Sequence, residues 1–573
     1  MRIDYQGALQ DTSYQVQLGL QGSWSQARAQ GLSAGWQRTF KGQTQWQGSV
    51  ALQLHPDSRY DYQTQWQSDL KGLGLAWPAP YTKSANQSLP LRVTARGNQS
   101  ASTLRADWQN GLQFVGQLDH RKHQFSRFWI SNQSTLDTLT PPAPVSLDLK
   151  FEQLDADAWQ TWWQQLGQPV DGATLNHAGS WLPPTQSVQV QSQQLMLASQ
   201  PWDKFSLQMT RDEKGVQGNV LANQLAGEVR WQPELPLNVE LAYLHWRNPD
   251  YNPDEPAGDA ETETEQKEVP PEVIPPIPSL AEQRSQMALW PDLDFHCQRC
   301  QLDHALLGDV RVEGRRAPDA YLLSAFSLKN GGHSVQGRGS WRLKPPLGQS
   351  DLHLTLKASS LEQMAKDWNY GAGFGGTPAT AELDVSWQGP LSQPHKPSMN
   401  GSFKLETGEG LLRKLDSTST RLLSMLSLNS LMRRLSLDFG DAFEKGFFFK
   451  SITATGSIRQ GMLHNEDFAL LGDAGDIAGR GKLDLVGKKL DYQFTFTPHF
   501  TNGVSLATAF AVTPVTGIYV LAASTLLSPV IDGITRISFH LEGPLASPQV
   551  TEIGREHGQL QNIPADYKKA LSR

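Results

Sequence analysis

The amino-acid sequence predicts a mainly β protein: a long, curved antiparallel β-groove with a few short helices and a helical segment near the C-terminus. Apolar and polar residues alternate with period two in many short runs, turn signals separate these runs, and few segments show helical periodicity. A sheet with one apolar face must cover that face. Because so few helices are available, we expect the sheet to curl on itself or to hold an apolar ligand.

The clearest alternating runs lie at residues 147–151, 352–356 and 490–496. One side of each run is apolar and the other is polar, which is typical of antiparallel strands with one wet face. Because successive side chains on a strand point to opposite faces, we expect the apolar members to line one inner face. These predicted lining residues are Leu147, Leu149, Phe151, Leu352, Leu354, Leu356, Leu490, Tyr492, Phe494 and Phe496.

Turn signals recur between the predicted strands. Asn330-Gly331-Gly332 stands between two strand-like runs and is a strong hairpin signal. Trp-Gln pairs precede apparent turn residues at several places, including 46–48 and 108–111. We interpret both as hairpin turns of a large β protein.

Four segments are predicted to be helical: 155–165, 361–368, 417–435 and 503–531. No charged residue occurs from Asn502 to Ile531, but Pro514 and Gly517 interrupt this stretch, which favours two short apolar helices over a membrane span. They would pack against protein or contact a membrane. We expect them at the mouth of the groove, which they would line with Leu506, Phe510, Tyr519 and Leu526.

The chain divides by composition into a β-groove segment at 1–250, an acidic, Pro-rich linker or inserted loop at 251–279, and a second β-groove segment at 280–573. The linker has almost no large apolar side chains, so it cannot fold alone. No apolar run follows the N-terminus, which therefore resembles neither a signal peptide nor an anchor. We expect a fragment, or the downstream half of a longer protein.

Composition excludes several function classes. The net charge of −7 over 573 residues is small and negative, whereas a nucleic-acid-binding protein would carry a basic field. No Ser/His/Asp set stands out, so we predict no catalytic residues and no cofactor, and we expect no metal unless the two cysteines bind one. The GxGxxG match at Gly371–Gly376 follows a helix-like run instead of a strand, which favours a flexible loop over a nucleotide site.

The chain has two cysteines, Cys297 and Cys300. A disulfide that pins a turn, a pair of free thiols and a metal site are all open at this point. A disulfide is the simplest account if the protein is periplasmic, because oxidising compartments favour disulfides.

Several stretches resemble the YhdP-type members of the AsmA-like family, a family of bridge-like periplasmic lipid transport proteins. The most specific is Arg433–Phe447, and the others are Leu70–Lys83 with Ser88–Val93, Asn223–Trp231, Gly337–Trp341 and Pro544–Val550. The resemblance implies a β-groove that shields the acyl chains of phospholipid or another acyl lipid. It also implies a periplasmic location and membrane contact at the C-terminal end. The resemblance implies that full-length relatives are anchored in the inner membrane, and we expect this chain to lack their N-terminal anchor.

The leading hypothesis is therefore a non-catalytic groove protein that moves phospholipid between the inner and outer membranes. About twenty-five strands spaced about 4.8 Å apart would give a groove on the order of 100 Å long. An alternative is a periplasmic scaffold or assembly factor for outer-membrane proteins, which would act by β-strand addition at an exposed sheet edge. A third is an all-β carbohydrate-active protein with paired carboxylates in a cleft.

Overall fold

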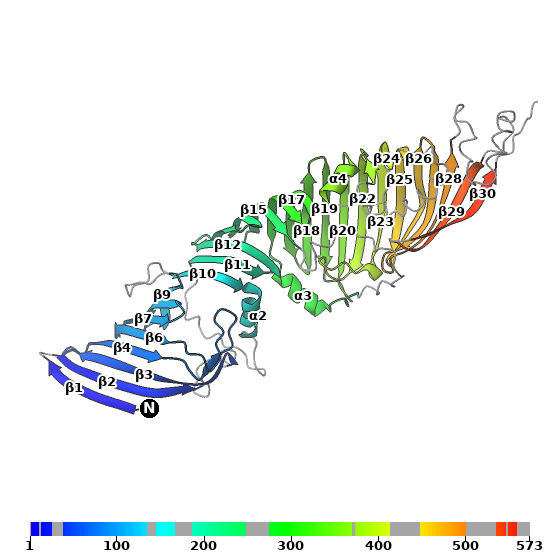
Figure 1. The fold of residues 1–573 in the computed structure, drawn as a ribbon. Helices are drawn as coiled ribbons and strands as arrows, with labels where there is room; N and C mark the ends of the chain where they lie inside the picture. The colour runs from blue at the N-terminus through cyan, green and yellow to red at the C-terminus, as the bar shows by residue number, and fades with distance from the viewer. Residues whose placement is uncertain are drawn as a thin grey trace, which may run out of the picture. The chain divides into compact units, whose positions relative to one another are not determined.

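The structure is a computed structural model that describes residues 2–10, 13–25, 38–133, 145–166, 186–247, 274–369, 373–412, 447–499, 534–545 and 548–557. The chain forms two compact units, Met1–Pro249 and Asp250–Arg573. Figure 1 shows each unit as a row of neighbouring strands with few helices. The described residues contain 30 strands and three α-helices, so the predicted mainly β fold class is confirmed. Most of the predicted linker at 251–279 lies outside them.

The described residues of the first unit form fifteen strands. They are β1 (Arg2–Gln10), β2 (Ser13–Ser25), β3 (Phe40–Leu54), β4 (Tyr60–Ser68), β5 (Leu73–Leu75), β6 (Leu91–Asn98), β7 (Ala101–Trp108), β8 (Gln113–Asp119), β9 (Gln124–Ser131), β10 (Val145–Asp155), β11 (Ser187–Leu197), β12 (Gln200–Arg211), β13 (Val216–Leu221), β14 (Leu225–Trp231) and β15 (Leu237–Trp246).

Neighbours in this unit follow chain order, except that the short β5 pairs with β3. Antiparallel pairs join β1 to β4 in sequence, then β4 to β6, and the pattern continues to β9. It resumes from β11 to β15. The exception is β10, which pairs in parallel with both β9 and β11. Parallel neighbours require a crossover connection, and helix α2 (Ala156–Leu166) lies in the one between β10 and β11.

The described residues of the second unit form another fifteen strands. They are β16 (Leu293–Leu302), β17 (Ala305–Ala317), β18 (Ala320–Asn330), β19 (His333–Arg342), β20 (Gln349–Ala358), β21 (Phe374–Gly375), β22 (Ala379–Gln388), β23 (Asn400–Thr407), β24 (Gly410–Leu412), β25 (Phe447–Arg459), β26 (Met462–Gly472), β27 (Gly475–Asp484), β28 (Lys489–Pro498), β29 (Ile534–Pro544) and β30 (Gln549–His557).

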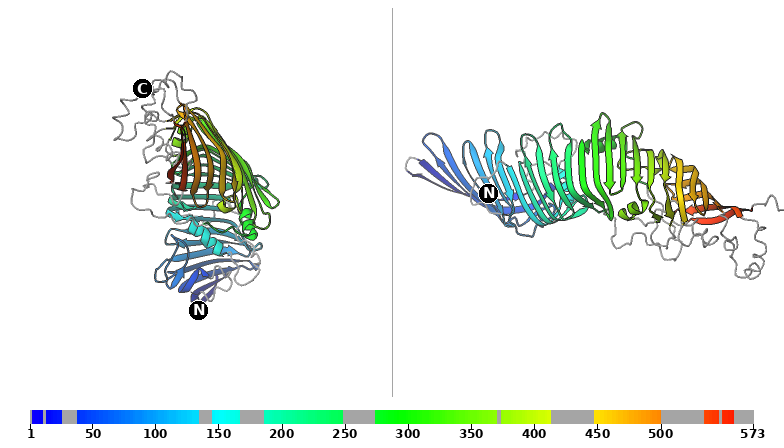
Figure 2. Two further views of the ribbon diagram at one scale, coloured as in Figure 1. Left: turned by 90° about the vertical axis from the view of Figure 1, so that its right-hand side faces the viewer. Right: turned by 90° about the horizontal axis from the view of Figure 1, so that it is seen from above.

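All strand pairs of the second unit are antiparallel among the described residues. Strands β16 to β20 pair in sequence, β22 and β23 continue the row, and β25 to β30 complete it, while the short β21 and β24 pair at its border. Figure 2 shows these strands side by side. Register shifts interrupt several pairs, including β25 with β26 and β26 with β27. Such bulges bend a strand and increase its twist, which favours a curved sheet.

The helices agree in part with the sequence predictions. Helix α2 and helix α4 (Leu361–Asp367) confirm the predictions at 155–165 and 361–368. The segments 417–435 and 503–531 lie outside the described residues. Helix α3 (Leu280–Leu289) was not predicted, although Ser279 and Glu282 form a capping box at its start. The structure also contains a 3-10 turn, η2 (Lys396–Ser398). None of the helices described is both long and apolar enough to cross a membrane.

The turn predictions had mixed outcomes. Asn330 ends β18 and His333 begins β19, and the two are paired across the turn, so the predicted hairpin is confirmed. Its Gly331 has a φ of 53°, a left-handed conformation that glycine adopts readily. The turn predicted at 46–48 is wrong, because β3 runs through these residues without a break. Gly48 is needed there for space beside Trp66 on the neighbouring strand.

Candidate functional site

Strand register brings the alternating apolar residues of the second unit onto one face. Directly paired residues of a sheet point to the same side. Leu354 on β20 pairs with Leu383 on β22, which pairs with Phe403 on β23. The same row continues through Gly456, Asn465 and Gly481 to Tyr492 on β28. The runs at 352–356 and 490–496 therefore share one side of the sheet, which we call the apolar face.

The first unit has a corresponding apolar face. One row of directly paired residues runs from β2 to β10 through Leu18, Val50, Thr64, Ala95, Leu104, Gly116, Phe128 and Val145. Leu147 and Leu149 follow Val145 on β10 with the same side-chain direction, and they pair with Val188 and Val190 on β11. The apolar face is thus continuous across neighbouring strands.

Burial shows how open these faces are. Along β4, every second residue from Tyr60 to Ser68 is half-buried, and the polar residues between them are exposed. Leu352, Leu354 and Leu356 on β20 are also only half-buried. Apolar side chains under a second layer of protein are normally almost fully buried. The apolar face therefore retains accessible hydrocarbon surface at these strands.

Glycines on the apolar face leave room for large side chains of the neighbouring strand to lie over them. A Cβ atom added at Gly48 would lie 2.5 Å from the ring of Trp66, and one at Gly337 would lie 2.5 Å from Leu354. Each large side chain thus occupies the space above the glycine on the neighbouring strand. Aromatic and aliphatic groups that cover a cross-strand glycine stabilise the pair. Here the arrangement also holds bulky side chains flat along the sheet.

The far end of the second unit is packed instead of open. Phe494 is 3% exposed and Phe496 is 1% exposed, and both belong to a cluster built mainly from β25 to β29. The rings of Phe468 and Phe494 meet edge to face with centroids 5.5 Å apart. Phe494, which was predicted to line the groove, is therefore enclosed by neighbouring side chains. Strand period gives the direction of a side chain, but the amount of packing around it depends on the tertiary structure.

Polar groups interrupt the packed cluster at Tyr492 and Asn465. The half-buried Tyr492 hydroxyl donates to the Asn465 side chain, whose amide donates to the Thr455 carbonyl at 2.6 Å. Burial raises the pKa of Tyr492 well above its usual range, and the nearby carboxylates of Asp467 and Glu466 add to this. Tyr492 therefore stays neutral and remains a hydrogen-bond donor. Leu490 is 7% exposed and packs in the same cluster.

The remaining predicted lining residues have different surroundings. Leu147 and Leu149 are half-buried, whereas Phe151 is 8% exposed and its ring lies 6.2 Å from that of Tyr81. The four residues predicted at the mouth of the groove, Leu506, Phe510, Tyr519 and Leu526, lie outside the described residues.

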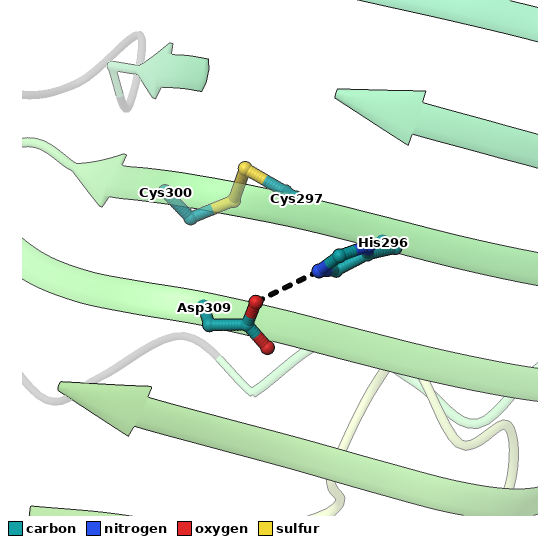
Figure 3. Close-up of a disulfide and its surroundings, with 4 residues drawn as sticks. All are labelled: His296, Cys297, Cys300 and Asp309. Carbon is teal, nitrogen blue, oxygen red and sulfur yellow. Dashed lines mark hydrogen bonds and ion pairs between the residues drawn. A yellow bond between two sulfur atoms is a disulfide. The ribbon is translucent and has the colours of Figure 1, made fainter. Parts of the chain in front are cut away.

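Cys297 and Cys300 are joined by a disulfide, with the sulfur atoms 2.23 Å apart (Figure 3). The two residues lie within β16 at a register shift, not at the turn that the sequence suggested. Cys297 is fully buried and pairs with Val310. Figure 3 also shows His296 and Asp309, whose side chains are 2.7 Å apart. This contact, together with Arg311, lowers the pKa of Asp309. No cluster of three or more potential metal ligands occurs among the described residues.

The burial of two polar side chains in the second unit, Gln283 and His333, was not predicted from the sequence. Gln283 on α3 is fully buried, accepts from the Trp341 indole at 3.0 Å and donates to the Leu347 carbonyl at 2.7 Å. His333, at the opposite end of the strands, is 4% exposed and its Nδ1 lies 3.7 Å from Asp367. Burial lowers the pKa of His333, and Asp367 opposes part of that shift. The capping box at α3 and the Asn330-Gly331-Gly332 turn before His333 were sequence signals near these residues, but neither indicated that the two side chains would be buried.

A hollow of about 830 Å³ lies at the ends of β3 to β7 and includes Gln47, Gln67, Arg92 and Asp107. These four side chains are paired across successive strands, one residue away from the apolar row, so they belong to the opposite, polar face. Such a lining suits water or polar groups. Acyl chains would instead favour the open hydrocarbon surface of the apolar face.

Comparison with known proteins agrees with this geometry. The intermembrane phospholipid transporter YhdP of Escherichia coli (strain K12) is 25% identical over 569 residues, which cover 97% of this chain and 42% of that protein. This chain thus spans less than half the length of that relative. The family described as YhdP protein matches residues 1–550. The chain therefore belongs to the YhdP family.

Proposed function

We propose that this chain is a non-catalytic conduit that moves phospholipid through the periplasm between the inner and outer membranes. The observation that carries the proposal is the apolar face of each unit, which is only half-buried on strands such as β4 and β20. The similarity to an intermembrane phospholipid transporter supports the same function. The disulfide between Cys297 and Cys300 supports an oxidising compartment such as the periplasm.

The dimensions of the face suit acyl chains. Fourteen strands follow one another in the row of the first unit, which at about 4.8 Å per strand gives a face about 65 Å long. One acyl chain extends about 15 Å, half the thickness of a bilayer core. Each buried methylene contributes roughly 0.8 kcal/mol, so several lipids could be held along the face and still move from strand to strand.

In the second unit, the proposed lipid path follows β16 to β23. There Leu352, Leu354 and Leu356 leave hydrocarbon accessible, while the cluster around Phe494 is already filled by protein. A lipid would have to displace packed aromatic rings to continue along β25 to β29. We infer that the open part of the face holds lipid most readily, and that lipid reaches the C-terminal mouth by displacing the packed rings of β25 to β29.

The decisive experiment is native mass spectrometry of the chain purified from a Gram-negative host, followed by transfer of fluorescent phospholipid between vesicles. We expect bound phospholipid and faster transfer in the presence of the chain. A folded chain that carries no lipid and does not accelerate transfer would contradict the proposal. Binding of extended peptides in the absence of lipid would favour the scaffold that acts by β-strand addition.

Membrane contact at the C-terminal end is part of the proposal. Residues 503–531 carry no charge, and in the proposed arrangement they form the mouth at which lipid enters or leaves. Deletion of 503–531 should leave a folded chain that binds phospholipid but no longer delivers it to vesicles. Unchanged delivery by the deleted chain would exclude this role.

A further inference from the structure

The two borders of the apolar face in the first unit have different chemistry. Strand β4 runs from Tyr60 at one border to Ser68 at the other, and the remaining strands end at the same two borders. The border beside Ser68 carries packed aromatic rings, and we call it the aromatic rim. The border beside Tyr60 carries hydroxyl, imidazole and basic groups, and we call it the polar rim.

The connection from β4 to β6 closes the aromatic rim. Its Trp77 lies 6.1 Å from Trp162 of α2, and its Tyr81 lies 6.0 Å from Trp159, measured between ring centroids. The Trp159 indole also donates to the Ala79 carbonyl at 3.0 Å. These contacts tie a loop that begins near β4 to a helix that follows β10. Apolar protein therefore covers the strand ends between them.

A hydrogen-bonded chain of side chains marks the polar rim. Tyr62 on β4, Ser102 on β7 and His120 in the turn after β8 are joined in that order through their side chains. His120 Nδ1 lies 3.2 Å from the Gln99 carbonyl, which can only accept, so Nδ1 carries a proton. Ser102 is 6% exposed, so this polar group is part of the folded interior at the edge of the apolar face.

A basic turn between β8 and β9 lies at the polar rim, next to the hydrogen-bonded side chains. His120, Arg121, Lys122 and His123 are consecutive, and the last three are exposed. The backbone N–H groups of Lys122 and Arg121 hydrogen-bond to Asp119 and, with the charges of both side chains, lower the pKa of that carboxyl. Asp119 thus shapes the turn and stays ionised. Two cationic side chains remain beside this single carboxylate at the solvent edge.

We propose that the polar rim is a headgroup site, in which the phosphate of a glycerophospholipid binds Arg121 and Lys122 while its acyl chains lie on the apolar face. The proposal rests on the proposed function and adds an orientation to it. Nine residues of β4 span about 30 Å, twice the length of an acyl chain. If the headgroup is bound at the polar rim, the acyl chains of that lipid therefore end before they reach the aromatic rim.

The position of the hydrogen-bonded side chains of Tyr62, Ser102 and His120 fits this orientation. Ester and glycerol oxygens lie between the phosphate and the acyl chains of a glycerophospholipid. In the bound lipid they would come next to Tyr62 and Ser102, between the basic turn and the hydrocarbon surface. At the aromatic rim, the basic residues of β6 and β7, Arg92 and Arg105, lie on the polar face, and Arg105 is paired with Asp107 at 2.8 Å. Headgroups should therefore project from the polar rim.

The test compares a fluorescent phosphatidylglycerol with a diacylglycerol that has the same acyl chains and label. The wild-type 573-residue chain should bind phosphatidylglycerol more tightly. The double variant Arg121→Gln and Lys122→Gln should bind it about fivefold more weakly, with diacylglycerol unchanged, and added salt should reduce the difference. Lys214→Gln, in the turn between β12 and β13 at the same border, is the control and should change neither affinity.

Each outcome decides between the two proposals. Equal affinity of the wild-type chain for both lipids, or equal loss in Lys214→Gln, would overturn the headgroup site and leave lipid binding intact. Failure of both lipids to bind would overturn the conduit as well. A phospholipid with a photoreactive headgroup gives an independent measurement. Its label should map to residues 120–123, and labelling of the 76–82 loop instead would refute the orientation.

Discussion

A carboxylate on the apolar face tests the lipid path directly, and Leu354→Asp is the most informative change. Leu354 is half-buried on β20, lies over Gly337 of β19 and pairs with Leu383 of β22. An aspartate there remains in contact with water when no lipid is bound. We therefore expect the free energy of unfolding to fall by only about 1 kcal/mol, roughly half the value of a fully buried leucine.

The effect on lipid binding should be larger. A bound acyl chain would have to leave the carboxylate hydrated, because burial of an unpaired charge in hydrocarbon is very unfavourable. If about three methylenes lose contact, the loss at about 0.8 kcal/mol each is about 2.4 kcal/mol. This corresponds to roughly a fiftyfold weaker affinity for lipids that occupy this position.

The assay is fluorescent phospholipid binding and vesicle transfer, with urea denaturation to confirm the fold. Gln336→Asp is the matched control, because Gln336 is exposed, neighbours Gly337 on β19 and pairs with Thr355 on the polar face. It introduces the same charge on the opposite side of the sheet and should leave lipid binding unchanged. Equal losses in the two variants, or full transfer by a folded Leu354→Asp chain, would refute the assignment of the lipid path to this face.

Three further predictions concern the fold. Phe494→Ala should lower the free energy of unfolding by about 3–5 kcal/mol in urea denaturation, and a loss below about 1 kcal/mol would show that the cluster is not packed. Gly48→Val should destabilise the chain by about 1–3 kcal/mol and change the fluorescence of Trp66, whereas Gly19→Val should not, because a Cβ at Gly19 would make only an ordinary contact with Asp4 at 3.7 Å. Because burial lowers the folded-state pKa of His333, the unfolded chain takes up a proton first. Stability should therefore fall as pH drops through about 6.5 towards that lower pKa, and an equally steep fall in His333→Gln would contradict this.

The strands, the hairpin turn at 330–332 and two helices could be predicted from sequence because their signals are local. Period-two alternation at 352–356 and 490–496 gave the direction of each side chain along its own strand. Asn330-Gly331-Gly332 gave the hairpin, because a tight turn needs residues that accept a left-handed backbone. The capping residue before α3 carried an equally local signal, which the sequence reading did not use. The order of several short stretches indicated the family from the sequence alone.

The surroundings of each residue, in contrast, depended on the tertiary structure. Leu354 and Phe494 carry the same alternating pattern, yet one is half-buried and the other is enclosed. Trp77 meets Trp162, and Ser102 meets His120, because strand pairing and a crossover helix bring distant segments to one border. Strand period is set by the backbone of each residue and its immediate neighbours. Burial, disulfide placement and the assembly of a polar rim are set by which strands become neighbours, and that information is distributed over the whole chain.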